Sequence, residues 1–151
     1  MIMNLSTRTI FFLILITKVI IGSFLASQFL TGYFIPFVDF FVESSFKNPY
    51  HYFMNKNQPD MFPYPSLMLY ILTVPKLLFG WLSPDPKVTF FDLFIYRLPL
   101  IIADISIFLI IRSWLKDKTT KLIQFYWLSP VLIYITYIHG QLDVIPIAFL
   151  F

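Results

Sequence analysis

Two acidic residues lie four positions apart in an aromatic segment of this sequence. Asp39 and Glu43 have the i, i+4 spacing that places two side chains on one face of a helix, which we expect over residues 38–46. A carboxylate held beside a hydroxyl group can act as a general base in group transfer. The same spacing is typical of a solvated pair on an amphipathic surface helix, so both interpretations stay open.

Five phenylalanines surround these acids: Phe34, Phe37, Phe40, Phe41 and Phe46. We expect their rings to rest on a membrane surface and to keep a carboxylate partly out of water. Two monodentate carboxylates supply too few ligands for a metal ion. We therefore expect Asp39 and Glu43 to work without a metal or other cofactor.

Further polar residues stand beside prolines and a glycine. Tyr64 lies between two prolines, which impose extended or turn geometry and are often followed by a helix start. His139, Gln141 and Asp143 share a short run with Gly140 that suits a tight turn. His139 and Asp143 are expected either to hydrogen-bond or share a ligand, or to form an ordinary turn between helices.

The composition indicates that these residues are positioned by membrane helices. Of the 151 residues 58% are hydrophobic and only 13% are charged, whereas soluble chains average about 45–50% and about 25%. This excludes an ordinary cytosolic enzyme. The absence of cysteine excludes disulfides and thiolate metal sites. The net charge of +3 comes from scattered basic residues beside apolar segments, so we expect no nucleic-acid partner.

Three segments approach the roughly 20 apolar residues that a membrane-crossing helix needs. They are residues 10–30, 93–115 and 122–138. The sequence therefore predicts an all-α, polytopic membrane protein with one continuous domain over residues 1–151. A cleaved signal peptide is the alternative for the first segment, but its length and the charge of Lys18 argue against it.

A fourth apolar segment, residues 66–82, decides the topology. It is short and contains Pro75, so we expect it to lie along the membrane surface with membrane lipids around it. Basic residues are concentrated between the second and third spans, which favours a cytoplasmic location: Arg112, Lys116, Lys118 and Lys121. The N-terminus is then cytoplasmic, and residues 31–92 form one long outer loop. The chain stops inside an apolar run, so we expect a fragment of a longer protein.

Besides Arg112 near the end of the second expected span, three charged residues fall deeper inside the spans, where an ionisable group is costly. At 1.5 Å per residue, Lys18 and Asp104 lie about 12 Å and about 16 Å from the inner ends of their spans. Because these depths nearly match, we predict that the two side chains pair, unless Lys18 reaches the interface along its own stem. Arg97 is expected to face the outer aqueous rim, and either bind a lipid phosphate with two donors or pair with Asp92.

Taken in order, these elements resemble the membrane-embedded C-type glycosyltransferases, which use a polyprenyl-phosphate sugar as donor. The residues that carry the resemblance are Asp39, Asn48-Pro49-Tyr50, Tyr64-Pro65-Ser66-Leu67, Arg97-Leu98-Pro99, Ala103-Asp104, Trp127-Leu128-Ser129-Pro130 and His139-Gly140-Gln141-Leu142-Asp143. The likeness covers residues 8–151 and is nearest to the dolichyl-phosphate-glucose-dependent glucosyltransferases and related lipid-linked mannosyltransferases.

The resemblance implies an inverting hexosyl transfer to a lipid-linked or protein acceptor on the outer or lumenal face. Asp39 would be the general base, and the substrate-binding residues would be Glu43, Tyr64, Arg97, His139, Gln141 and Asp143. Many members have a second acid where this chain has Phe40, and Ser66 stands in place of a usual proline. The identity of the sugar stays open.

Two other functions remain as alternatives. One is a membrane transporter or flippase, in which charges inside spans line a path. The inverted repeats that many transporters contain are not evident in this sequence. The other is an inactive, truncated remnant of a membrane protein.

Overall fold

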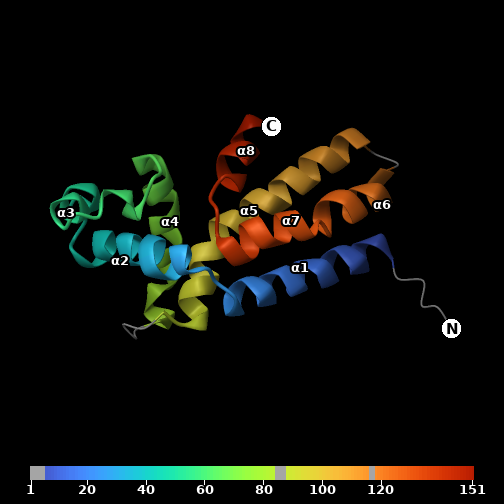
Figure 1. The fold of residues 1–151 in the computed structure, drawn as a ribbon. Helices are drawn as coiled ribbons and strands as arrows, with labels where there is room; N and C mark the ends of the chain where they lie inside the picture. Colours follow the sequence, from blue (N-terminus) through green and yellow to red (C-terminus); the bar gives the residue numbers. More distant parts are fainter. Residues whose placement is uncertain (1–5, 84–87, 116–117) are drawn as a thin grey trace.

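The computed structural model describes residues 6–83, 88–115 and 118–151 (Figure 1). Of the described residues 81% are helical and none is in a strand, as the composition predicted. Two helices, α1 (Thr7–Phe24) and α5 (Phe90–Leu115), are long and apolar enough to cross a membrane. They pack side by side and form the spine of the fold.

Helix α1 is shorter than the span predicted for residues 10–30. Ser6 caps its start by accepting a hydrogen bond from the amide of Thr9 at 3.2 Å. The helix ends at Phe24, and Leu25 has extended backbone with φ −111° and ψ 130°. The prediction of one continuous helix was wrong because the backbone beyond Phe24 forms hydrogen bonds with other elements. The Ser27 amide, for example, donates to the Ile138 carbonyl at 3.0 Å.

The expected third span, residues 122–138, is not one straight helix. The helical segment Thr119–Trp127 is followed by a second one, Pro130–His139, at an angle of 49°. Pro130 has no amide hydrogen and disfavours helical backbone in the residue before it. Ser129 instead caps the second segment, whose Leu132 amide donates to its hydroxyl at 3.5 Å. The described part therefore has two candidate spans, or three if the bent pair counts as one.

The remaining helices gather mainly at one end of the spine (Figure 1). We call this group the helical platform; its members are the turn Leu30–Phe34, α2 (Ile35–Glu43), α3 (Pro49–Asn55), the turn Pro59–Met61, α4 (Ser66–Phe79) and the turn Gly80–Leu82. The last helix, α8 (Val144–Leu150), packs against α5. Helix α4 and the turn after it occupy the bounds predicted for the surface segment, and α4 packs on α2 and α5.

Three of the five phenylalanines around Asp39 and Glu43 serve a different purpose from the predicted one, while Phe46 is 55% exposed. Phe34, Phe37 and Phe41 are buried in the protein's own core, where the Phe37 and Phe62 rings stack with centroids 4.9 Å apart. They therefore do not rest on a membrane surface. Helix α2 also begins and ends earlier than the expected residues 38–46, because Ser45 and Phe46 have positive φ angles of 59° and 64°.

The predicted pairing of Lys18 with Asp104 is present in the structure. The Lys18 Nζ lies 2.8 Å from Asp104 Oδ2, and both side chains are almost fully buried. The hydroxyls of Tyr126 and Tyr137 donate to the same carboxylate at 2.8 and 2.7 Å. Lys18 Nζ also sits 3.5 Å from the centre of the Trp127 ring. The carboxylate thus joins α1, α5 and both halves of the bent segment, and Lys18 does not reach the interface.

The variant Lys18→Met should lower the free energy of unfolding by about 3–5 kcal/mol, because it leaves the Asp104 charge buried without its cation. Unfolding of the purified protein in detergent measures this loss. Lys47→Met, at an exposed position, is the control and should change little. The double variant Lys18→Met/Asp104→Asn should recover at least half of the loss. A Lys18→Met protein as stable as the wild type would contradict the role of the pair.

Candidate active site

Lys76 of α4 links two carboxylates from two other helices. Its Nζ lies 2.9 Å from Asp39 Oδ1 on α2 and 2.9 Å from Asp92 Oδ1 in the first turn of α5. The three side chains carry a net charge of −1 when all are ionised. They meet where the helical platform joins the spine, because α4 packs against both α2 and α5.

Asp92 is the member of this group whose two carboxylate oxygens both have partners. Its Oδ2 accepts hydrogen bonds from the Thr89 amide and hydroxyl, both at 2.9 Å, and from the Ser83 hydroxyl. The Asp92 amide donates in return to the Thr89 hydroxyl at 3.4 Å, which completes a capping box at the start of α5. With a side chain only 5% exposed, Asp92 serves to anchor Lys76.

Asp39 is the member of this group whose carboxylate can still bind another molecule. Its side chain is 27% exposed, Oδ1 is bound to Lys76, and Oδ2 accepts no hydrogen bond from the described residues. Burial raises the pKa of the Asp39 carboxyl above its usual value, and Lys76 opposes this rise only in part. Burial alone would lower the pKa of Lys76, but hydrogen bonds to Asp92 and Asp39 more than compensate and raise it. The lysine therefore stays charged, and Asp39 is a stronger base than an exposed aspartate.

A pocket of about 680 Å³ opens beside this group. Its polar lining residues are Asp39, Glu43, Lys76, Ser83 and Asp92, and its other walls are Ile35, Pro36, Phe40, Val42, Leu77, Gly80, Trp81 and Val88. Asp39 and Glu43 thus face the same pocket from one side of α2. A mixed pocket of this size with a partly dry carboxylate can hold a small polar group and take a proton from it.

Arg97 does not lie where the sequence predicted. Its side chain is buried, and Nη2 donates to the carbonyls of Leu25 and Ile138 at 3.0 and 3.3 Å. Gly22 makes room for it, since a Cβ there would lie 2.7 Å from Arg97 Cδ. Arg97 therefore satisfies the carbonyl freed where α1 ends, and neither faces an aqueous rim nor pairs with Asp92.

Tyr64 holds the platform together and does not line the pocket beside Asp39. Its hydroxyl accepts a hydrogen bond from the Leu142 amide at 3.5 Å, and its carbonyl accepts one from the Tyr50 hydroxyl at 2.8 Å. Its ring packs edge-on against Phe34, with centroids 5.7 Å apart. In this structure Tyr64 joins the helical platform to the turn that follows the bent segment.

The predicted cluster of His139, Gln141 and Asp143 is a connecting turn. Gly140 adopts a left-handed φ of 81°, and the His139 ring stacks on Phe29 with centroids 5.6 Å apart. Asp143 is exposed and forms no hydrogen bond with His139. None of the three lines the pocket beside Asp39. The structure therefore supports the interpretation as an ordinary turn.

Sequence reasoning missed Lys76 as the common partner of Asp39 and Asp92. Lys76 was expected only as part of the surface segment 66–82, and Asp92 only as an alternative partner of Arg97. Two signals point to the observed contacts. Thr89-Phe-Phe-Asp92 has the spacing of a capping box, and Lys76 is the only charged residue in the apolar segment 66–82, so it needs an acidic partner when its helix packs.

Comparison with protein families, with characterised proteins and with solved structures finds no match to this chain. Within the described residues, no group of three or more histidine, aspartate or glutamate side chains could hold a metal ion.

Lys76→Gln should lower the free energy of unfolding by about 2 kcal/mol, because it leaves the buried Asp92 carboxylate without its cation. The loss is smaller than for a fully buried ion pair because the Lys76 side chain is 16% exposed. Lys47→Gln removes the same charge from an exposed position between α2 and α3 and should change stability by less than about 0.5 kcal/mol. Chemical unfolding in detergent compares the two. Equal effects would show that the Lys76 bridge contributes nothing specific.

Proposed function

We propose that this chain is part of a membrane glycosyltransferase that moves a hexose from a polyprenyl-phosphate donor to an acceptor hydroxyl, with Asp39 as general base. The observation that supports the proposal most directly is the state of Asp39. One oxygen of its carboxylate is fixed by Lys76, the other accepts no hydrogen bond from the described residues, and both stand at the wall of a pocket of about 680 Å³. The resemblance to the C-type glycosyltransferases supplies the reaction class.

The proposed reaction needs one base. Oδ2 of Asp39 takes the proton of the acceptor hydroxyl, and the resulting oxygen nucleophile forms a bond to the anomeric carbon. The bond from that carbon to the donor phosphate breaks, and the polyprenyl phosphate leaves with the electron pair. Attack from the opposite face inverts the configuration. Because phosphate is already a stabilised anion, no general acid is required, in contrast to a glycosidase.

The neighbours of Asp39 have separate roles in this proposal. Lys76 is a positioning residue that fixes the carboxylate, and Asp92 holds Lys76 in place through its own network. Glu43 lies one turn after Asp39 on the same pocket wall and is the candidate for binding acceptor hydroxyls. Arg97 has no role at the donor phosphate here, because it is enclosed between α1, α5 and the bent segment.

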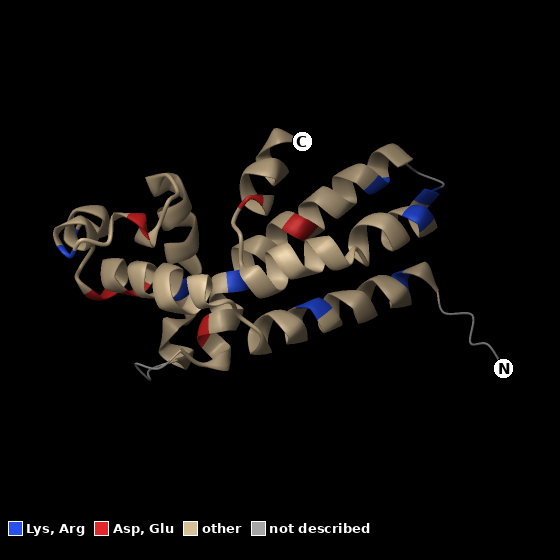
Figure 2. Cartoon of the chain, viewed as in Figure 1, with Lys and Arg blue, Asp and Glu red and all other residues tan. Residues whose placement is uncertain are grey.

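The position of the pocket suits a lipid-linked donor. It lies where the helical platform joins the spine, and α4 with the turn after it presents exposed apolar side chains there, including Leu77, Leu78 and Trp81. We assign this end of the spine to the outer or lumenal side, because the basic residues Arg112, Lys118 and Lys121 belong to the other end and basic loops favour the cytoplasm (Figure 2). The prenyl chain would then remain in the bilayer beside α4.

Asp39→Asn in the full-length protein should reduce hexose transfer about 10²- to 10⁴-fold, the range for loss of a general base. The assay follows radiolabelled sugar from polyprenyl-phosphate hexose into acceptor in isolated membranes, with Lys47→Gln as a control of unchanged activity. Unchanged transfer by Asp39→Asn would remove Asp39 from the reaction. Absence of transfer by the wild type would remove the enzyme class.

The acid limb of the pH–activity profile should lie above the usual aspartate pKa of about 3.9, because burial raises the pKa of Asp39. Activity requires the ionised carboxylate, so it is lost as the pH falls through this raised pKa. Lys76→Gln should move the limb to higher pH, and Glu43→Gln should move it to lower pH, since these neighbours lower and raise the Asp39 pKa respectively. Shifts in the same direction for both variants would contradict the assignment.

A transporter or flippase is the second candidate, and the buried Lys18–Asp104 pair is the observation that favours it. Ionisable groups at such depth mark ion or proton paths in many transporters. Both side chains are closed off from solvent, at 1% and 5% exposure. Proteoliposomes that contain the wild type separate the candidates: substrate flux without sugar transfer, abolished by Asp104→Asn, would favour transport.

A further inference from the structure

The end of the spine remote from the platform carries a second, unassigned concentration of charge. We call it the basic end; its described members are Arg8 at the start of α1, Arg112 in the last turns of α5, and Lys118 and Lys121 beside α6 (Thr119–Leu122). Figure 2 shows that the described acidic residues lie elsewhere along the molecule. No described carboxylate forms an ion pair with Arg8 or Arg112.

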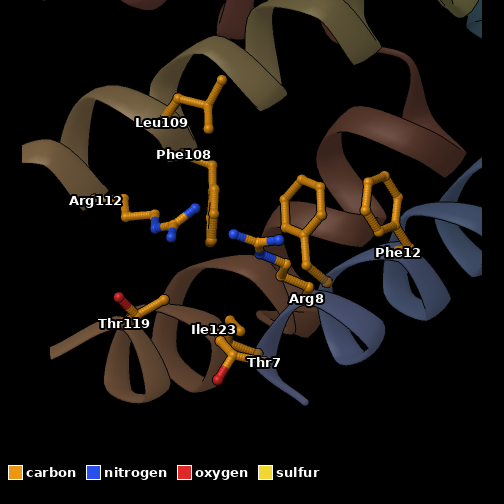
Figure 3. A pocket seen from close by; sticks show the side chains of 9 residues that line it. Thr7, Arg8, Phe12, Phe108, Leu109, Arg112, Thr119 and Ile123 are labelled. Atoms are coloured by element: carbon orange, nitrogen blue, oxygen red, sulfur yellow. The ribbon is translucent and has the colours of Figure 1, made fainter. Parts of the chain in front are cut away.

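Two of these residues converge on a pocket of about 380 Å³ between α1, α5 and α6. Figure 3 shows the guanidinium groups of Arg8 and Arg112 pointing toward one another over this pocket. The walls beneath them are apolar and include Phe12, Phe108 and Leu109. The pocket thus has a cationic mouth and a hydrophobic interior.

Two guanidinium groups that face one another repel, and an anion between them turns this repulsion into attraction. Phosphate fits the geometry because a guanidinium donates two parallel hydrogen bonds to its oxygens. The apolar part of the pocket requires the ligand to carry a hydrocarbon as well. Phe12 and Leu109 are 58% and 50% exposed on the two candidate spans, so an acyl chain can follow them from the mouth toward the middle of the bilayer.

We propose that this pocket binds an anionic phospholipid. Its phosphodiester lies between Arg8 and Arg112, and one acyl chain lies along Phe12 and Leu109. Free phosphate would use only the mouth of the pocket, and a neutral lipid would leave the two arginines uncompensated. This site is separate from the proposed sugar-transfer pocket, contains none of its residues and does not depend on the role of Asp39.

The first test measures binding of dioleoyl phosphatidylglycerol to the full-length protein in detergent. Arg8→Gln/Arg112→Gln should weaken binding about 30-fold, since each basic group at a membrane surface accounts for about a fivefold factor. Lys47→Gln/Lys56→Gln removes the same charge from the platform and should leave binding within about twofold of the wild type. Equal affinity in the two double variants would overturn the proposal, because it would reduce the effect to net charge.

A matched variant separates guanidinium geometry from charge. Arg8→Lys/Arg112→Lys keeps both charges but loses the paired donors, and should bind several-fold more weakly than the wild type. Arg8 and Arg112 are exposed and form no hydrogen bond with the described residues, so these variants should keep the wild-type thermal unfolding midpoint. Wild-type affinity in the lysine variant would remove the specific phosphate contact from the proposal.

Ligand variation tests the acyl chain with the arginines intact. Dioleoyl phosphatidylglycerol should bind the wild type more tightly than its dihexanoyl analogue, inorganic phosphate or dioleoyl phosphatidylcholine. Phe12→Gln/Leu109→Gln should reduce affinity for the dioleoyl lipid and leave affinity for the dihexanoyl lipid unchanged. Binding of inorganic phosphate as tight as that of the lipid would show a free-anion site, and equally tight phosphatidylcholine would show a general apolar groove; either result overturns the proposal.

Discussion

The buried carboxylate of Asp104 imposes the constraint on which the rest of the structure depends. A carboxylate in the middle of membrane helices must be neutralised and hydrogen-bonded, and Asp104 receives an ammonium from Lys18 and hydroxyls from Tyr126 and Tyr137. These partners come from α1 and from both halves of the bent segment. Satisfying one charge therefore fixes how α1 and the bent segment are placed around α5.

From that arrangement the candidate active site follows in steps. Arg97 lies on α5 where α1 ends, and it binds the carbonyls of Leu25 and Ile138. The chain can then leave the spine and enter α2, whose buried phenylalanines pack it against α4. This packing brings Asp39 to Lys76. The two charged groups are built alike but differ in exposure: Asp104 and Lys18 are both buried, whereas Asp39 keeps one oxygen open to a pocket.

The two ends of the spine differ in charge and in the ligands they fit. The platform end places a carboxylate with a raised pKa beside a pocket of mixed polarity, which suits the handling of a hydroxyl group. The basic end places two arginines over an apolar pocket, which suits an amphiphilic anion. In the proposed enzyme, an anionic lipid bound at the basic end would fix the depth of the candidate spans, and with it the position of the platform relative to the bilayer.

The sequence by itself determined what depends on local pattern and depth. Composition indicated a helical chain with apolar helices, and proline and length delimited residues 66–82, which α4 and the turn after it occupy. Similar depth in two spans predicted that Lys18 meets Asp104. Only the tertiary structure decided the partners of Asp39 and Arg97. Their contacts depend on where α1 ends and on how α2 crosses α4. The spacing of residues along one helix does not encode either feature, because backbone groups that are freed at a helix end compete with side chains for the same hydrogen-bond donors.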